Sequence, residues 1–242
     1  MTDAGVDLAG RTWRTVADDA LLIVPVGSTE QHGPHLPLDT DTRIAVALAR
    51  AAVSAIPIAL CAPALAYGSS GEHAGFPGTL SIGAEALELV LVELVRSADR
   101  FRGVVLVNGH GGNVPVLSRV SRRCEAEGRA VLVWSPSLDS LDPPRRVADA
   151  HAGWFETSLM LHLAPGDVDM DAAEAGNTDP LPAIFERLVR DGVHNVSPNG
   201  VLGDPSGASA HDGRVMFEAL TAALIQAVTV WMGGLRPGPS VS

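Results

Sequence analysis

Short apolar runs alternate with longer amphipathic stretches along this chain. Each run ends at or near Gly, Pro or Ser, which is typical of buried strands; the runs are 21–27, 56–66, 103–109 and 130–136. Helical spacing of apolar residues predicts helices at 42–55, 83–101, 113–128, 152–164, 181–191 and 213–233. The alternation predicts an α/β fold with a mostly parallel sheet covered by helices on both faces. We find no internal repeat or linker and expect one domain over residues 1–242.

The composition argues against several classes of protein. With 46% apolar and 19% charged residues the chain can bury a core, and its net charge of −11 speaks against binding nucleic acid or an anionic membrane. The N-terminus lacks the apolar segment of a signal peptide. Glu218 and Gln226 interrupt the last helix, so we expect it to pack against the protein and not to span a membrane. Cys61 and Cys124 lie in predicted elements, so we expect structural thiols in a reduced, cytoplasmic protein.

The stretch "STEQHGPHLPLDTD", directly after the first strand, holds many potential metal ligands. In extended backbone Glu30 and His32 point to the same side. Asp41 opens a helical pattern, where it would either cap the helix or bridge two cations beside Glu30 and His32. Carboxylates with imidazoles suit zinc, manganese, iron or cobalt. Asp39 and His35 would support the ligands, line the entrance or lie in a solvated loop.

A second segment, "NGHGGN" (108–113), follows the strand predicted at 103–109. In a parallel sheet, ligands bind beyond the carboxyl ends of the strands, so His110 and the first segment should share one edge. The glycines around His110 permit close backbone approach, and Asn108 and Asn113 can hold the turn. We interpret His110 as a metal ligand, with a surface loop as the alternative.

The third segment is "HAGWFETSLMLHL" (151–163). Glu156 lies on the apolar stripe of the predicted helix, and a buried carboxylate needs a partner. That partner would be a metal ion or, alternatively, Arg43 or Arg119. His151 can join Glu156 only if it precedes the first helical turn, and a histidine beside a metal site is a candidate proton shuttle. Trp154 and Phe155 are expected in the core.

A glycine-rich segment, "YGSSGEHAGFPGTLS" (67–81), follows another predicted strand end. We expect it to form one wall of the same cleft. Glu72 and His73, together with Asn113, are the candidate substrate-positioning residues, and a loop without function is the alternative for His73. Tyr67 is a further candidate for the wall.

The motifs "PVGSTEQHGPHLPLDTD", "GEHAGFPGTLS", "LVNGHGGN" and "HAGWFETSLML" resemble, in this order, those of the creatininase family of metal-dependent amidohydrolases. The resemblance implies a three-layer α/β/α fold, two divalent ions (Zn, Fe(II) or Mn) and a homo-oligomer such as a hexamer. The implied ligands are Glu30, His32, Asp41 as the bridging carboxylate, His110 and, as the remaining ligand with a catalytic role, Glu156. His151 matches a histidine implicated in proton transfer.

Within this family, "VSPNGVLGDPSGAS" (196–209) and "GSSGEHAGFPGTLS" resemble the creatininase-like peptidase of mycofactocin biosynthesis. That likeness implies hydrolysis of a radical-SAM-modified precursor peptide near its C-terminus, which would release the modified Val-Tyr core. The alternatives are a cyclic amide such as creatinine, a formamide, or a member that binds without catalysis. Gly112 stands where creatininase proper has a glutamate ligand, which counts against creatinine and leaves Glu156 to supply the second ion.

Overall fold

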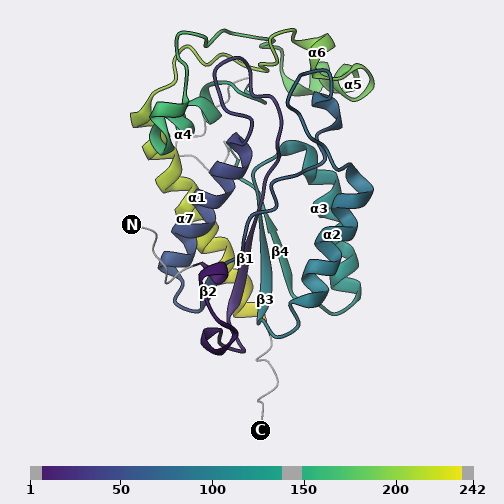
Figure 1. Ribbon diagram of the computed structural model, residues 1–242, viewed down its shortest axis with the longest axis vertical. Helices are drawn as coiled ribbons and strands as arrows, with labels where there is room; N and C mark the ends of the chain where they lie inside the picture. Colours follow the sequence, from purple (N-terminus) through teal and green to yellow (C-terminus); the bar gives the residue numbers. More distant parts are fainter. Residues whose placement is uncertain (1–6, 138–148, 236–242) are drawn as a thin grey trace.

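The central sheet has four parallel strands in the order β2-β1-β3-β4 (Figure 1). The computed structural model describes residues 7–137 and 149–235. The strands are β1 (Leu21–Val26), β2 (Ala59–Cys61), β3 (Gly103–Asn108) and β4 (Val131–Trp134). β1 and β3 are buried along their whole length and pair up to Val26 and Asn108. Such strands are covered on both faces, which explains their continuous apolar runs.

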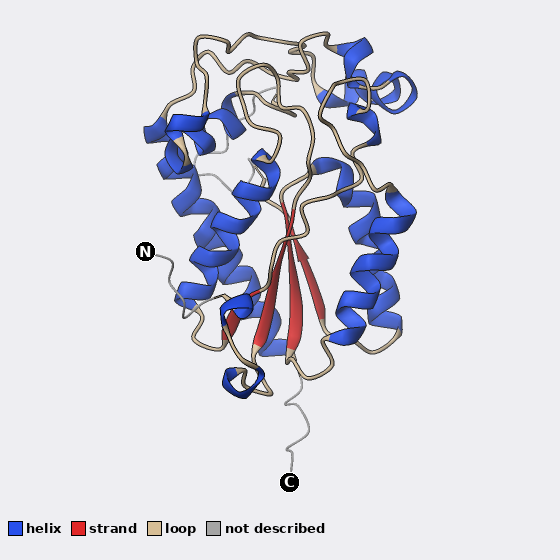
Figure 2. Ribbon diagram, viewed as in Figure 1, coloured by secondary structure: helices blue, strands red, loops and turns tan. Residues whose placement is uncertain are grey.

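Helices cover both faces of this sheet (Figure 2). One face carries α1 (Thr40–Ala55), α4 (Trp154–Leu163) and α7 (Ala210–Gly234), and the other carries α2 (Ala84–Ser97) and α3 (Val114–Ala126). Alternate residues of β1 serve two cores, because successive side chains of a strand point to opposite faces. Leu21 and Ile23 pack with α1, α4 and α7, whereas Leu22 and Val24 pack with α2 and α3. The predicted α/β fold is confirmed.

The carboxyl end of the sheet is covered by loops and short helices, at the top of Figure 1. The α-helices there are α5 (Leu181–Asp191) and α6 (Val193–Val196). The 3-10 helices of the described residues are η1 (Leu8–Gly10), η2 (Trp13–Thr15), η3 (Gly71–His73), η4 (Gly111–Asn113) and η6 (Pro165–Asp167).

The second predicted strand is much shorter than its apolar run. The run at 56–66 predicts a long strand, but only Ala59–Cys61 pairs with β1, and Leu65 adds an isolated bridge to Val26. Pro57 and Pro63 flank the strand and cannot donate to a ladder, which limits its length. The helix predicted at 83–101 ends at Ser97, and α6 was not predicted.

α7 is long and apolar enough to cross a membrane by length and composition. In the structure it packs along α4 and α1, with Met216, Leu220 and Leu224 buried in their shared core. The Ser209 side chain accepts a hydrogen bond from the Asp212 backbone N–H (3.1 Å) and caps the first turn. The helix packs as the sequence predicts, over 210–234 instead of 213–233.

The chain reverses its winding direction between β1 and β3. From β1 it crosses through α1 to the edge strand β2, and from β3 it crosses through α3 to β4, on the opposite face. At such a switch point the loops after the two strands diverge and leave a crevice at their carboxyl ends. The loops that follow β1 and β3 carry the segments with His32 and His110.

Candidate metal centre

The loops after β1 and β3 bring three buried side chains together. His110 Nδ1 lies 3.1 Å from Glu30 Oε1 and 3.2 Å from Asp41 Oδ2. Ser28 Oγ donates a hydrogen bond of 2.7 Å to the same Asp41 oxygen. Glu30, Asp41 and His110 therefore form one group of possible metal ligands, which we call the first group.

Two glycines let helix α1 approach the strand ends this closely. Gly27 follows β1, and a Cβ there would overlap the backbone of Thr42. Gly109 follows β3, and a Cβ there would overlap the carbonyl oxygen of Asp41. Because neither residue has a side chain, the first turn of α1 rests on the ends of both strands. Asp41 is thus held between the two loops.

A second group of possible metal ligands, His32, Asp41 and Glu156, lies beside the first. His32 Nε2 lies 3.0 Å from Asp41 Oδ1 and 3.9 Å from Glu156 Oε2. The same oxygen of Glu156 accepts a hydrogen bond from the Ala152 backbone N–H (2.6 Å). Ala152 has φ of 53°, and among the described residues it is the one non-glycine with a positive φ. This strained turn aims its N–H at Glu156.

Both groups suit metal ions by burial and donor type. Glu30 is fully buried, and within the described residues neither of its carboxylate oxygens makes a hydrogen bond. A buried carboxylate faced only by imidazole nitrogens needs positive charge, which a protonated His110 or a divalent ion would supply. Mixed oxygen and imidazole nitrogen donors are those that zinc, manganese and iron(II) accept. Asp41 belongs to both groups and has a carboxylate oxygen toward each.

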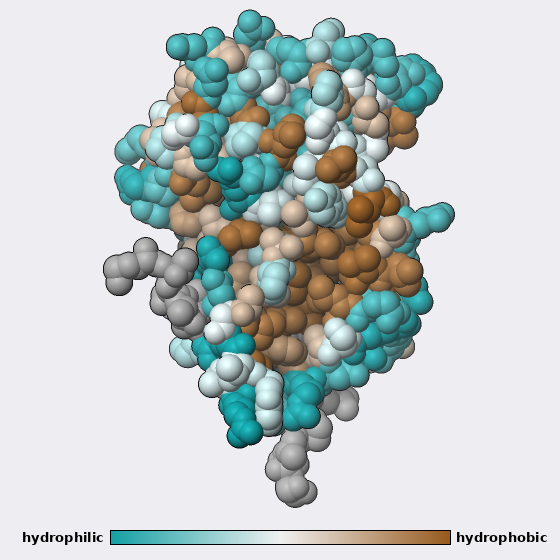
Figure 3. Space-filling view, viewed as in Figure 1, coloured by the Kyte–Doolittle hydropathy of each residue, from teal (hydrophilic) through white to brown (hydrophobic). Residues whose placement is uncertain are grey.

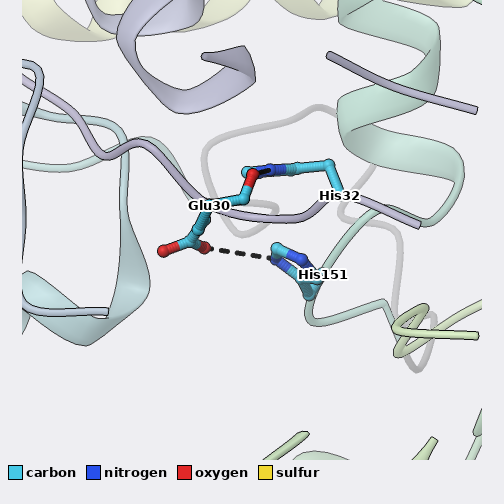
Figure 4. Close-up of side chains that lie close together, drawn as sticks. All are labelled: Glu30, His32 and His151. Atoms are coloured by element: carbon cyan, nitrogen blue, oxygen red, sulfur yellow. Dashed lines mark hydrogen bonds and ion pairs between the residues drawn. The ribbon is translucent and has the colours of Figure 1, made fainter. Parts of the chain in front are cut away.

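Three further buried side chains, His151, His73 and Gln31, form a network beside these groups. His151 Nδ1 lies 3.8 Å from Glu30 Oε1, and these two residues form a third group with His32 (Figure 4). The other ring nitrogen of His151, Nε2, lies 2.8 Å from the Gln31 carbonyl oxygen and donates to it. This hydrogen bond leaves the Nδ1 lone pair directed at the cluster.

Gln31 connects the walls of the site. Its side-chain N–H groups reach His73 Nδ1 (2.8 Å) and the Gly200 carbonyl oxygen (3.1 Å), and its side-chain oxygen accepts from the Gly33 N–H (2.9 Å). With Nδ1 as acceptor, His73 carries its proton on Nε2, which lies 3.3 Å from Glu30 Oε1. Sequence reasoning missed Gln31; its one signal is its place between two predicted ligands.

Neighbouring charges set the pKa values in this cluster. Burial disfavours the charged form of His32, but Asp41 and Glu156 outweigh burial and raise its pKa to about 10. Burial is likewise outweighed at His110, where Glu30 and Asp41 raise the pKa. Burial raises the pKa of Glu156 to about 8. Without metal, protonated imidazoles therefore supply the positive charge that the carboxylates need.

His151 differs from the histidines of the two groups. Burial and the neighbouring His32 and His73 lower its pKa well below the ordinary value of 6.5. His151 is therefore neutral near pH 7, with a free lone pair on Nδ1. α4 begins at Trp154, so His151 precedes the first helical turn, which is the condition under which the sequence lets it share a site with Glu156.

Asp41 and Glu156 do not take the alternative roles that the sequence left open for them. α1 begins at Thr40 after Asp39, so Asp41 is not the residue that caps the helix. Glu156 is not paired with either arginine considered for it: Arg43 pairs with Asp39 and Asp167, and Arg119 with Glu88.

The structure separates Asp39 from His35. Asp39 is half-exposed beside Arg43, outside the cluster. His35 is buried, and its Nε2 lies 2.8 Å from Thr157 Oγ1, next to Glu156 in α4. Trp154 is buried in the core and Phe155 packs against it, as expected.

A cavity of about 730 Å³ opens beside the cluster. Glu72, His73, His110 and His151 line it. Asn113 does not: its side chain donates to Asn108 Oδ1 within the turn and to the Gly27 carbonyl oxygen, and it accepts from the Ser69 N–H. This placement favours the turn-holding role of Asn113 over the predicted substrate contact. Tyr67 is half-exposed and lies outside the residues that line the cavity.

Glu72 occupies the space beside Gly112. Its Oε1 lies 3.7 Å from His110 Nε2, on the side of the ring that faces away from the first group. A Cβ at residue 112 would overlap Glu72 Oε1, His110 Nε2 and the Ser69 carbonyl oxygen. The missing side chain at Gly112 therefore leaves room for Glu72 against His110.

This chain is similar to known proteins both in sequence and in fold. The creatininase family, described as creatinine amidohydrolase, matches residues 9–228. The mycofactocin precursor peptide peptidase of Mycobacterium tuberculosis is 49% identical over 221 residues, which cover 87% of this chain and 85% of that protein. Creatinine amidohydrolase of Pseudomonas putida is 29% identical over 242 residues, covering 89% and 91%. A solved structure described as "Creatininase Mn" has a TM-score of 0.75 at 26% identity and covers 96% of this chain and 100% of that one.

Proposed function

The chain belongs to the creatininase family and is a hydrolase of C–N bonds, and from this premise we propose that it cleaves the mycofactocin precursor peptide. The cleaved amide would lie near the C-terminus of the radical-SAM-modified peptide, and its hydrolysis would release the modified Val-Tyr core. The observation that carries a hydrolytic role is the pair of donor groups that share Asp41, all of them buried except the partly buried Glu156. The 49% identity to a peptidase of that precursor supports this substrate over creatinine or a formamide.

The two donor groups fit two divalent ions. Glu30 and His110 would hold one ion, His32 and Glu156 the other, and Asp41 would bridge them. Ions bound there supply Lewis-acid polarisation of the amide carbonyl and lower the pKa of water to about 7. The chain's own contribution is to fix the donors: Ser28 holds Asp41, and Ala152 holds Glu156. Zinc, manganese and iron(II) all match this set.

His151 would move the proton that amide hydrolysis requires. The leaving nitrogen must gain a proton as the C–N bond breaks. His151 is neutral, and its Nδ1 faces the cluster while Nε2 is tied to the Gln31 carbonyl. Nδ1 is thus the atom that takes up a proton and returns it. His151→Ala should keep bound metal and lower kcat about 10²- to 10⁴-fold, whereas His162→Ala in α4 should leave kcat unchanged.

The substrate can be tested directly. Protein purified anaerobically would be loaded with zinc, manganese or iron(II) and incubated with the modified precursor peptide, creatinine and a formamide. We expect mass spectrometry to show release of the C-terminal core from the peptide and loss of that product after EDTA treatment. Formamide or creatinine hydrolysis without peptide cleavage would remove this proposal.

We also propose a cytoplasmic homo-oligomer. Figure 3 shows apolar side chains gathered across the middle of one face, between more polar regions. Exposed apolar side chains of the described residues include Leu80, Leu89 and Val90, and patches of this kind mark interfaces. Cys61 and Cys124 are buried free thiols, which suits a reducing compartment. Light scattering should give a multiple of the 25.1 kDa chain mass, with a hexamer expected.

A further inference from the structure

Helix α5 has one broad apolar face, of which one part is buried and the adjoining part is exposed. Ile184 and Leu188 are buried in a small core that joins α5 to α6. Leu181, Phe185 and Val189 recur every four residues and are 44, 55 and 71% exposed. Side chains four apart lie on one face of a helix, so these three form a continuous stripe, which we call the α5 stripe. A helix ordinarily buries its apolar face, so the α5 stripe is a part of that face which the described residues leave uncovered.

The α5 stripe opens onto the cavity beside the candidate metal centre. Its three residues line the same cavity of about 730 Å³ as His73, His110 and His151. Gly111 and Gly112 contribute to the lining without side chains, so the space between the histidines and α5 is left open. A ligand in this cavity can therefore contact the α5 stripe while an amide bond lies at the histidines.

The size and chemistry of the cavity select the kind of ligand. Pockets of about 300–1,000 Å³ take ligands of drug size, so this one is large for a small cyclic amide. Charged residues lie at two places, with Glu72 near His110 and the Arg190–Asp191 ion pair at the end of α5. Between them the α5 side is apolar, which favours an apolar group over a charged one.

α5 is fixed to the wall of the metal centre. α5 and α6 both pack against η3, the short helix that carries Glu72 and His73. The buried core of α5 also contains Leu202, whose backbone pairs with that of His151. The helix that carries the α5 stripe thus packs against the segments that carry His73 and His151.

We propose that the α5 stripe is the subsite for a bulky apolar side chain next to the cleaved amide of a peptide substrate. This inference rests on the proposed peptidase function. Phe185 lies at the centre of the α5 stripe and stacks on or packs against that side chain, with Leu181 and Val189 on either side. Burial of these exposed apolar groups contributes to peptide binding, and a small amide cannot reach them.

A double-mutant cycle tests the contact. Metal-loaded protein and its Phe185→Ala and Val189→Ala variants would be assayed on two precursor peptides, one with a bulky apolar residue beside the cleaved amide and one with alanine there. We expect Phe185→Ala to lower kcat/KM about tenfold on the first peptide, mainly through KM, and to have little effect on the alanine peptide. Val230→Ala in α7 is the matched control for Val189→Ala, because Val230 is as exposed as Val189 but lies outside the cavity.

The possible outcomes separate this inference from the function on which it rests. If the unaltered protein cleaves the peptide but Phe185→Ala affects both peptides equally or neither, the subsite assignment is wrong and the peptidase stands. If Phe185→Ala changes the oligomeric state in light scattering, the α5 stripe contacts a second copy of the chain, and the assignment is also wrong. If the unaltered protein leaves the peptide intact, both proposals fall. Phe185 is half-exposed, so its truncation should leave the melting temperature unchanged.

Discussion

The two donor groups that share Asp41 are built in different ways. The first group comes from loops that directly continue two paired strands, where Val26 lies opposite Asn108. The second depends on Glu156 in α4, more than a hundred residues further along the chain than His32. Glu156 is positioned by the strained turn at Ala152. The comparison indicates that strand pairing organises one proposed ion site before any ion binds, whereas the other relies on packing between distant segments.

Asp41→Asn should have the largest effect on activity and metal binding, because Asp41 is the one residue that the first and second groups share. Loss of a residue that merely orients a ligand costs about 10- to 100-fold, so loss of the shared carboxylate should exceed 100-fold in kcat. Metal analysis should show both ions missing while circular dichroism stays unchanged. Asp39→Asn, two residues away and paired with Arg43, should retain both ions. Two ions bound to Asp41→Asn would refute the bridge.

Glu30→Gln and Glu156→Gln should each remove one ion and keep the other. Each replacement preserves shape and removes negative charge from only one of the two groups that share Asp41. The metal-to-protein ratio should fall from two to one in both variants, with stronger residual binding in Glu156→Gln because the first group is held by paired strands. Complete metal loss from Glu156→Gln would show that the first group does not bind alone.

The pH dependence of metal binding should distinguish the groups. Without metal, His32 with a pKa of about 10 and Glu156 with a pKa of about 8 both hold protons below pH 8, so an ion in the second group displaces two protons. An ion in the first group displaces one, from His110, whose pKa is raised. Between pH 6 and 8 the affinity of the second site should therefore rise about 100-fold per pH unit and that of the first about tenfold. If metal titrations showed the same change of affinity with pH at both sites, this difference in displaced protons would be wrong.

Thermal melting in EDTA tests the raised pKa values of His32 and Glu156 in the metal-free protein. His32 is stabilising when protonated, so its contribution is fully present below its ordinary pKa of 6.5 and is lost as pH rises through about 10. Glu156 acts in the same direction, because its raised pKa favours the protonated form. The metal-free protein should melt a few degrees lower at pH 9 than at pH 6.5, and bound metal should remove the difference.

Gly112→Ala should have the smallest effect and should act on the first group alone. The added Cβ would displace His110 or Glu72, which lowers affinity for the first ion about tenfold. Gly111→Ala is the matched control, because a Cβ there meets nothing within 4 Å. Equal affinities in the two variants would show that Glu72 and His110 are not held against each other.

The main features of the fold could be read from the sequence, because strand and helix patterns differ in period. The meeting of Glu30 with His110 also followed, since parallel strands place their carboxyl ends at one edge. What could not be read was the strand order that makes β1 and β3 neighbours. The length of β2 was overestimated, because apolar content does not reveal where a ladder ends.

Site residues that act through distant contacts were the hardest to predict. Gln31 contacts His73 and Gly200, which lie 42 and 169 positions away, and a single sequence does not reveal such pairs. Asn113 was predicted both to hold the turn and to contact substrate; in the structure its amide donates to Asn108 Oδ1 within the turn and to the distant Gly27 carbonyl oxygen. Glu156 could be placed on the apolar side of its helix because its helical neighbours are apolar; the structure shows it partly buried and shows where the competing arginines bind.

The close seating of α1 on Gly27 and Gly109 has a consequence for how this protein can vary. Neither glycine offers a group to an ion, yet one extra carbon at residue 109 would push the Asp41 backbone away from its position between the loops. A methyl group at residue 109 would therefore disturb the site as the loss of the Asp41 carboxylate would. For anyone who redesigns this hydrolase, residues 27 and 109 accept no side chain as long as α1 keeps its place.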